Sequence, residues 1–149
     1  MYFNDPDNEW GNQILVINFI IASTIEKYSM DRGATQINID NELLLKYFES
    51  IIVPEIDDER VKKYPILSSQ CIKFIIIYRN YIPHDWMTGI VEKLTSFLTN
   101  ESIVIRTYSS CAIDKLLSMR NMDTKEFLFT KEVIKPMLLN LLSQLNFLI

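Results

Sequence analysis

The sequence contains few of the residues that build loops, disulfides and metal sites. Its 149 residues include three glycines, two cysteines and one histidine. So few glycines exclude an active site made from a glycine-rich loop, and they argue against a β-protein with many tight hairpins, whose turns consume glycine. Two cysteines do not make a disulfide framework. We therefore expect Cys71 and Cys111 to be reduced thiols, both packed inside apolar helices.

The sequence also lacks a basic excess and a long apolar run. Its formal net charge is −4, its pI is about 5.0, and its lysines and arginines are scattered. We expect no nucleic-acid partner, since that affinity depends on clustered basic residues. The most apolar run, residues 14–25, is interrupted by Asn18, Ser23 and Thr24. A membrane span needs about 20 apolar residues, so we expect no membrane insertion. The first nine residues are acidic and polar, unlike a signal peptide.

Apolar residues at helical spacing dominate the rest of the chain. The sequence is 48% hydrophobic, and a chain of this size buries roughly 70% of its unfolded surface. In one segment Leu67, Cys71, Phe74, Ile75 and Tyr78 follow the spacing of a single helix face. Strict alternation typical of strands is absent. The pattern predicts an all-α fold with six helices, at residues 10–30, 41–56, 65–82, 85–99, 102–120 and 131–149.

Polar breaks and capping residues support these boundaries. Asp40 stands where it can cap the second helix. Pro65 is tolerated in the first turn of the third, because its missing N–H needs no partner there. Pro83 ends that helix, and His84 with Asp85 is expected to cap the next. The residues between the helices, including 31–40 and 57–63, are predicted to be loops.

An internal repeat is the strongest signal in the sequence. Residues 68–80 resemble residues 109–121 at a shift of 41 positions, with a Ser-Ser start and an Arg-Asn end in both. Apolar positions fall on apolar positions, except that Phe74 falls on Lys115. A period of about 40 residues with two helices per unit is typical of HEAT and armadillo repeats. We predict an α-α superhelix of three helix pairs, at residues 10–56, 65–99 and 102–149.

Several stretches in the same order resemble the CAS family of nuclear export receptors, within the importin-β superfamily. The clearest are residues 65–80 (PILSSQCIKFIIIYRN) followed by Ile82 and Pro83, and residues 101–120 (ESIVIRTYSSCAIDKLLSMR). Trp10 with the apolar helix to Ile25, residues 33–36 and residues 48–54 also resemble the family. The resemblance covers about 140 residues. It departs at Arg106, where the family carries a histidine-type residue, and at Asp114 and Lys115, which exchange polar character.

The resemblance implies a segment of a much longer solenoid. Members of that family bind importin-α together with Ran in its GTP form, shuttle between nucleus and cytoplasm, and are karyopherins that meet nucleoporins. The apolar end of the chain, from Leu138 to the last residue, agrees with a missing next repeat, because solenoids need polar capping repeats. We expect the isolated chain to self-associate through Leu138, Leu141, Leu145 and Leu148.

The sequence lacks the combinations of residues that form known types of catalytic site. His84 stands alone beside Asp85, which we interpret as a helix cap, and there is no serine nucleophile elbow, phosphate loop or zinc ligand set. We expect no enzyme activity, no cofactor and no metal. An all-α enzyme is therefore the weakest hypothesis. A stand-alone helical-repeat scaffold or adaptor that binds another protein remains the alternative to the receptor segment.

Binding through a surface is what remains. In HEAT solenoids the second helix of each pair usually lines the concave side, which here means residues 41–56, 85–99 and 131–149. Acidic residues there suit basic partners through electrostatic steering. Glu55, Asp57, Asp58 and Glu59 are expected to form an acidic loop that could also meet a basic partner. Residues 127–129 (FLF) are either an exposed patch or part of the core. The candidate partner-binding residues are Glu42, Lys46, Glu49, Glu55, Asp57, Asp58, Glu59, Glu92, Lys93 and Lys135.

Overall fold

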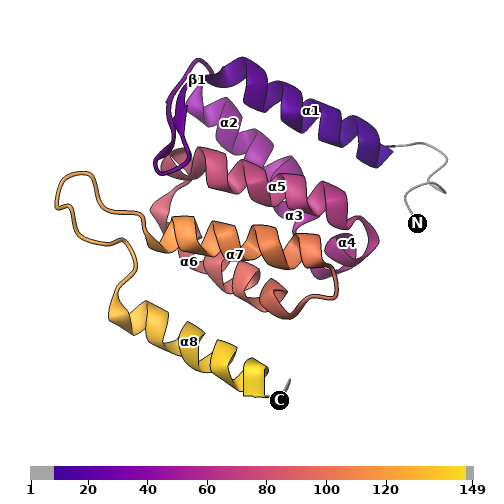
Figure 1. Cartoon of the computed structure of the whole chain (residues 1–149). Helices are drawn as coiled ribbons and strands as arrows, with labels where there is room; N and C mark the ends of the chain where they lie inside the picture. Colours follow the sequence, from indigo (N-terminus) through magenta and orange to yellow (C-terminus); the bar gives the residue numbers. More distant parts are fainter. Residues whose placement is uncertain (1–8, 147–149) are drawn as a thin grey trace. The chain divides into compact units, whose positions relative to one another are not determined.

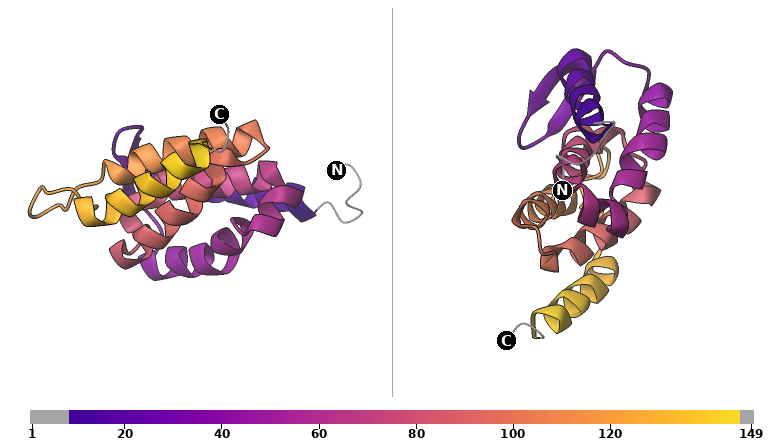
Figure 2. Two further views of the ribbon diagram at one scale, coloured as in Figure 1. Left: turned by 90° about the horizontal axis from the view of Figure 1, so that it is seen from below. Right: turned by 90° about the vertical axis from the view of Figure 1, so that its right-hand side faces the viewer.

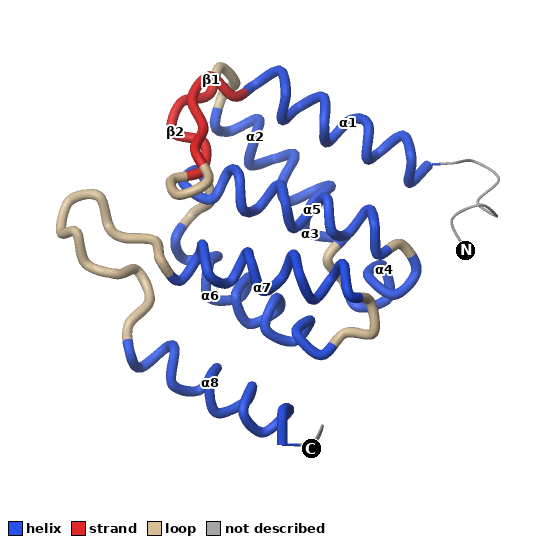
Figure 3. The backbone as a smooth tube through the Cα atoms, viewed as in Figure 1, coloured by secondary structure: helices blue, strands red, loops and turns tan. Residues whose placement is uncertain are grey.

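The computed structural model describes residues 9–146. Nearly all regular structure in this part of the chain is helical, with one two-stranded sheet (Figure 3). This confirms the all-α prediction. The chain divides into two compact units, Met1–Ile82 and Pro83–Ile149, and each is described by itself.

The first unit contains five α-helices, a hairpin and two short helical turns of other types (Figure 1). In chain order they are α1 (Glu9–Thr24), β1 (Ile25–Ser29), β2 (Gly33–Ile37), α2 (Asn41–Tyr47), the π-helical turn η2 (Phe48–Ile52), α3 (Val53–Glu55), α4 (Asp58–Lys63), α5 (Pro65–Tyr78) and the 3₁₀ turn η3 (Arg79–Tyr81).

The helix predicted over residues 41–56 is present as the continuous run α2–η2–α3. Asp40 caps it as expected, since its carboxylate accepts a hydrogen bond from the Glu42 N–H at 2.8 Å. The π-helical turn ends at Ile52, two residues before Pro54. Proline has no N–H to continue an α-helical ladder and clashes with the preceding turn. A wider turn at this point accommodates it.

The prediction of one helix over residues 10–30 is wrong at its C-terminal end. α1 stops at Thr24, where the Thr24 hydroxyl donates to the Ile20 carbonyl at 2.8 Å and the Ser23 hydroxyl to the Phe19 carbonyl at 2.7 Å. Such back-bonding competes with the helix ladder. The chain then forms the antiparallel hairpin β1–β2, in which Ser29 faces Gly33 next to the turn. Gly33 has φ +74°, a conformation that glycine adopts without strain.

The loop predicted over residues 57–63 is wrong as well, because most of it forms α4. Its first turn carries Asp58 and Glu59 and its last turn Lys62 and Lys63. This arrangement matches the helix dipole at both ends. The segment looked like a polar break because only Val61 of the helix is buried.

The core of the first unit is built around α5, which lies against α1, α3, α4 and β2. α1 runs beside α5 (Figure 1, and Figure 2, right view). Ten of the fourteen residues of α5 are buried, so the helix is enclosed around most of its circumference, and a narrow face with Ile66, Gln70 and Lys73 is exposed or half-buried. Phe74 is at the centre, with its ring centroid 4.4 Å from that of Tyr78, 5.8 Å from Tyr47 and 6.5 Å from Phe48.

The second unit contains α6 (His84–Ser96), the 3₁₀ turn η4 (Phe97–Thr99), α7 (Ile103–Leu117) and α8 (Lys131–Asn146). The predicted helices at 85–99, 102–120 and 131–149 are present, although the fifth ends three residues early and residues 147–149 lie outside the described part. The expected His84–Asp85 cap is not formed: Pro83 is the N-cap residue and His84 is already helical. The core consists of residues from α6, η4 and α7 together with Met119 and Phe129.

The boundary between the two units falls between α5 and α6. It therefore lies inside the predicted pair 65–99. The assignment of three pairs at 10–56, 65–99 and 102–149 stays a prediction.

Candidate interaction surface

The outer face of α2–η2 carries three of the predicted residues in a row. Glu42, Lys46 and Glu49 follow helical spacing and are all exposed. The opposite face of the same run, which includes Leu44 and Phe48, is buried. Glu42 and Lys46 stand in the order that favours an i, i+4 pair. The exposed side chains of Glu42, Lys46 and Glu49 therefore form a charged ridge on a helix whose opposite face is packed in the core.

Glu55 was expected to belong to an exposed acidic loop, and this expectation is wrong. It ends α3 with only 7% of its surface exposed. Its carboxylate oxygens accept hydrogen bonds from Arg60 Nη2 at 2.7 Å and Nε at 2.9 Å. The bidentate pair raises the pKa of Arg60, chiefly through the hydrogen bond to Glu55. Glu55 therefore has a structural role, because its side chain is committed to Arg60.

The acidic segment that reaches solvent is Asp57, Asp58 and Glu59, all exposed at the start of α4. These carboxylates lie near the positive end of the helix dipole, which stabilises them. Lys62 and Lys63 follow within the same helix. The segment is thus a dipolar helix surface rather than an isolated acidic loop.

The three candidates of the second unit are less uniform. Glu92 on α6 and Lys135 on α8 are exposed, whereas Lys93 is half-buried with its Nζ 5.5 Å from the centre of the Phe97 ring. A lysine held over an aromatic ring keeps its stem against apolar surface. The candidate residues are divided between the two units. The described residues therefore do not place all of them in one site.

The segment 127–129 is split between surface and core. Phe129 is buried, and Phe127 is 53% exposed with the Arg120 guanidinium 4.1 Å from its ring centre. Of the two alternatives predicted from the sequence, the core position applies to Phe129 and the exposed patch to Phe127.

A family model and several individual relatives match this chain. The model of the Cse1 family matches residues 1–113. The chain belongs to the Cse1 family. This confirms the resemblance found in the sequence.

Individual relatives of this Cse1-family chain agree. It is 31% identical to exportin-2 of Mus musculus over 146 residues and 30% identical to exportin-2 of Homo sapiens over the same length. It is 28% identical over 144 residues to a Schizosaccharomyces pombe protein named importin-alpha re-exporter. Each match covers 97% of this chain and 15% of the relative. The chain thus spans about one seventh of the length of these relatives.

Sequence reasoning missed an apolar face of this Cse1-family segment. On α1 the side chains of Leu15 and Phe19 are 68% and 71% exposed. They were read only as part of an apolar run, although their i, i+4 spacing was visible in the sequence. On α8, Leu138 was expected to be exposed and is, at 51%. Leu141 is half-buried, while the side chains of Leu145 and Leu148 lie outside the described part.

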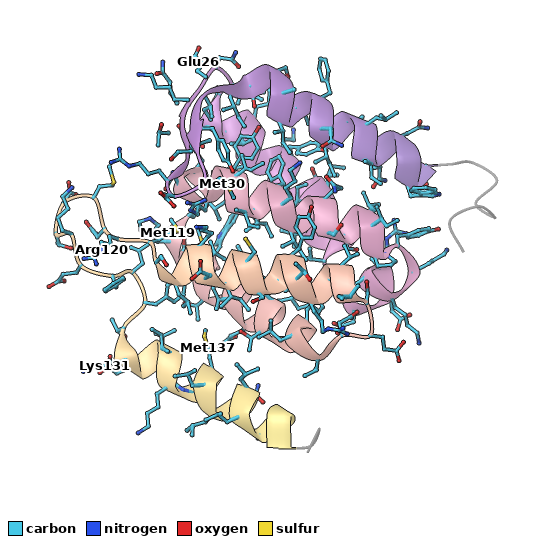
Figure 4. All side chains as sticks on the ribbon, in the orientation of Figure 1. Glu26, Met30, Met119, Arg120, Lys131 and Met137 are labelled. Atoms are coloured by element: carbon cyan, nitrogen blue, oxygen red, sulfur yellow. The ribbon has the colours of Figure 1, made fainter. Side chains whose placement is uncertain are left out.

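Leu138 and Leu141 also line a hollow within the second unit. A cavity of about 60 Å³ lies there between α6, η4, α7 and α8, and Met137 points into it from α8 (Figure 4). Thr95 is the polar exception, and its hydroxyl donates to the Val91 carbonyl at 2.7 Å. The lining is otherwise apolar and has no group for acid–base chemistry. The residues around it are Val91, Thr95, Leu98, Ile113, Leu117, Ile134, Met137, Leu138 and Leu141.

Reactive side chains in the described residues are few and separate. No group of three or more His, Cys, Asp or Glu that could hold a metal occurs among them. No helix in residues 9–146 is long and apolar enough to cross a membrane. Cys71 is buried, and desolvation raises the pKa of its thiol. Cys111 was expected to be packed as well, but it is exposed.

Proposed function

We propose that this chain is a segment of a nuclear export receptor that carries importin-α out of the nucleus in complex with Ran-GTP. The observation that carries the proposal is the match over 97% of the chain to proteins named exportin-2 and importin-alpha re-exporter. Its relatives are named for transport and not for a reaction. The proposal includes shuttling between nucleus and cytoplasm, with nucleoporins as further partners.

The segment acts as part of the spine and binding wall of the receptor, and it has no catalytic role. Two features of the described residues support this. Helices are the main elements, and their charged side chains stand on packed bases, as in the ridge of Glu42, Lys46 and Glu49. Glu92 and Lys135 are exposed on the other two predicted second helices, at residues 85–99 and 131–149.

Transport follows from coupling between partners. Repeats that contact only their neighbours flex easily, so their curvature responds to what they bind. If importin-α and Ran-GTP both stabilise one curvature, each raises the affinity for the other by the same factor. Release then follows when GTP is hydrolysed, because one of the two stabilising partners is lost.

Co-precipitation of the native protein tests the proposal. An antibody against this chain is used to recover the protein from cell extract supplied with Ran locked in its GTP or its GDP form. We expect importin-α in the GTP sample and little in the GDP sample. Equal amounts in both samples, or none in either, would contradict the receptor assignment and favour a scaffold for another protein.

Charge reversal then tests the ridge. We expect the double substitution Glu42→Lys and Glu49→Lys to weaken the recovery of importin-α or Ran-GTP. The matched control is Glu101→Lys, which reverses an exposed carboxylate outside the three predicted second helices. If both variants behave as wild type, the ridge of α2–η2 is not a contact surface, whereas the receptor assignment still depends on the first experiment.

A further inference from the structure

The tip of the β1–β2 hairpin is held by two residues at the far end of α5. Arg79 is the largest fully buried side chain among the described residues, with 2% of its surface exposed. Its Nη2 donates to the Asp31 carbonyl at 2.7 Å and to the Met30 carbonyl at 3.4 Å. Both carbonyls belong to the turn between the strands. Figure 4 shows Met30 at this tip, beside the end of α5.

Asn80 holds the same turn from its other side. Its side-chain amide donates to the Arg32 carbonyl at 2.6 Å and to the Ala34 carbonyl at 2.9 Å. Arg79 and Asn80 thus donate together to the carbonyl groups of four residues: Met30, Asp31, Arg32 and Ala34. Contacts that span almost fifty residues of sequence fix the turn, in addition to the short ladder between the strands.

Arg79 also closes the end of α5. Its Nη1 donates to the Ile76 carbonyl at 2.6 Å, one of the carbonyls that a helix end leaves without a helical partner. A cation there is favoured by the helix dipole. One guanidinium therefore joins the helix end to the hairpin.

Gly33 leaves the room that this arrangement needs. A Cβ at this position would stand 2.8 Å from Arg79 Nη1 and 2.9 Å from the Ile77 carbonyl oxygen. Its φ of +74° is also unfavourable for any other residue. The hairpin can approach the end of α5 only because this residue has no side chain.

The hairpin has a second attachment at its base. The Asn38 N–H donates to the Thr24 carbonyl at 2.9 Å, and the Thr24 hydroxyl shares a 2.6 Å hydrogen bond with the Tyr78 hydroxyl. The base is therefore anchored without Arg79 or Asn80. The tip also packs its buried residues Gly33 and Ala34 where β2 contacts α5 and η3. Release of the tip, these two residues included, leaves the strands attached to α1 and α5 only at the base.

We propose that Arg79 and Asn80 form a latch that docks the hairpin, residues 25–37, and that the hairpin swings free as one arm when the latch opens while the helices stay packed. The latch decides where the exposed side chains of Tyr28 and Met30 are displayed. This inference concerns a conformational device in the first unit and does not depend on the proposed function.

Limited proteolysis of the 149-residue chain tests the latch. Lys27 and Arg32 are exposed trypsin sites in the arm, and cleavage of a folded segment requires it to open locally. We expect Asn80→Ala to raise the cleavage rate at both sites about tenfold or more, with unchanged helical circular dichroism. Gly33→Ala is expected to do the same from the hairpin side. The matched control, Asn121→Ala at the end of α7, should leave both rates unchanged.

Two outcomes overturn the proposal. If Asn80→Ala and Gly33→Ala leave Lys27 and Arg32 at the wild-type rate, the hairpin is held by its own ladder and base. If Asn80→Ala removes the helical signal, the contacts belong to the core and not to a latch. Arg79→Lys is a further variant, but the decision depends on Asn80 and Gly33, because losing a buried guanidinium contact risks unfolding the unit.

Discussion

The same dipeptide stands directly after α5 and three residues past the end of α7, and its two copies make different contacts. Arg79-Asn80 and Arg120-Asn121 stand 41 residues apart in the sequence repeat. Arg79 is buried and holds the turn of a hairpin nearly fifty residues away, as described above. Arg120 is exposed, and its Nη1 donates to the Lys125 carbonyl at 3.1 Å, five residues on. Asn121 likewise accepts from the N–H groups of its own turn, at Asp123 and Thr124.

The helices before these pairs differ in the same way. Five matched positions in or next to the two helices are buried in both: Tyr64 and Ile105, Ser68 and Ser109, Cys71 and Ala112, Ile75 and Leu116, and Tyr78 and Met119. These positions form one stripe, and the agreement supports the shift of 41 residues. Around the stripe most other positions of α5 are buried as well, whereas α7 exposes residues such as Cys111 and Asp114. A shared pattern thus predicts the common face, and the neighbours of each helix decide the rest.

The largest expected difference is at Phe74 and Lys115, which occupy matched positions. Phe74→Ala removes a fully buried ring that contacts three other aromatic residues, and such a change lowers the free energy of unfolding by about 3–5 kcal/mol. Lys115→Ala on a partly exposed face should change it by about 0.5 kcal/mol or less. Urea unfolding followed by circular dichroism measures both. Similar losses in the two variants would contradict the difference between the helices.

Thiol labelling offers the next largest contrast. Cys111 is exposed and Cys71 is fully buried, so the native chain should present one fast thiol and one slow thiol. The rates should differ at least about a hundredfold, because exposing a core helix takes several kcal/mol. Cys111→Ser should remove the fast phase. Two equally fast phases would mean that α5 does not protect Cys71 in the native chain.

Alkaline pH should destabilise the first unit. Burial, with a smaller contribution from Cys71, raises the pKa of Tyr47 from 10.0 to about 12. Because the folded-state value lies above the unfolded value, the stability is fully present below pH 10 and is lost as the pH rises from 10 towards 12. The melting midpoint should fall in this range. Tyr47→Phe should fall less steeply, and an equal slope in both would contradict the role of Tyr47.

The smallest effect is expected at the matched serines. The Ser68 hydroxyl donates to the Glu55 carbonyl at 2.7 Å. Ser68→Ala should therefore lower the free energy of unfolding by about 1 kcal/mol. The Ser109 hydroxyl is buried and has no hydrogen-bond partner among the described residues. Ser109→Ala should be neutral or slightly stabilising in the same urea measurement, and a larger loss at Ser109 than at Ser68 would reverse the comparison.

Much of the helical pattern could be predicted because apolar periodicity, Asp40 and Pro65 are local signals. The hairpin could not, since its strands are short, mostly exposed and dependent on Arg79 and Asn80. A single marker, Gly33, was visible, but its meaning depends on a distant helix end. α4 was missed because one buried residue makes no stripe.

The candidate site was predicted in part for a similar reason. Exposure of Glu42, Lys46 and Glu49 follows from helical spacing around a buried face. Glu55 is buried because it pairs with Arg60. The sequence shows four acidic residues within the five positions 55–59, and this pattern does not reveal the pairing. The identity of the family came from ordered sequence similarity, since no chemical motif in the chain specifies it.

Amide hydrogen exchange of the wild-type chain tests the central comparison most directly. If long-range contacts anchor the first Arg-Asn pair and local ones the second, the hydrogen-bonded amides of the hairpin should exchange slowly, although faster than those of α5, because the arm opens while the helices stay packed. Amides at residues 121–127 should exchange far faster. A hairpin that exchanges as fast as residues 121–127 would contradict this account.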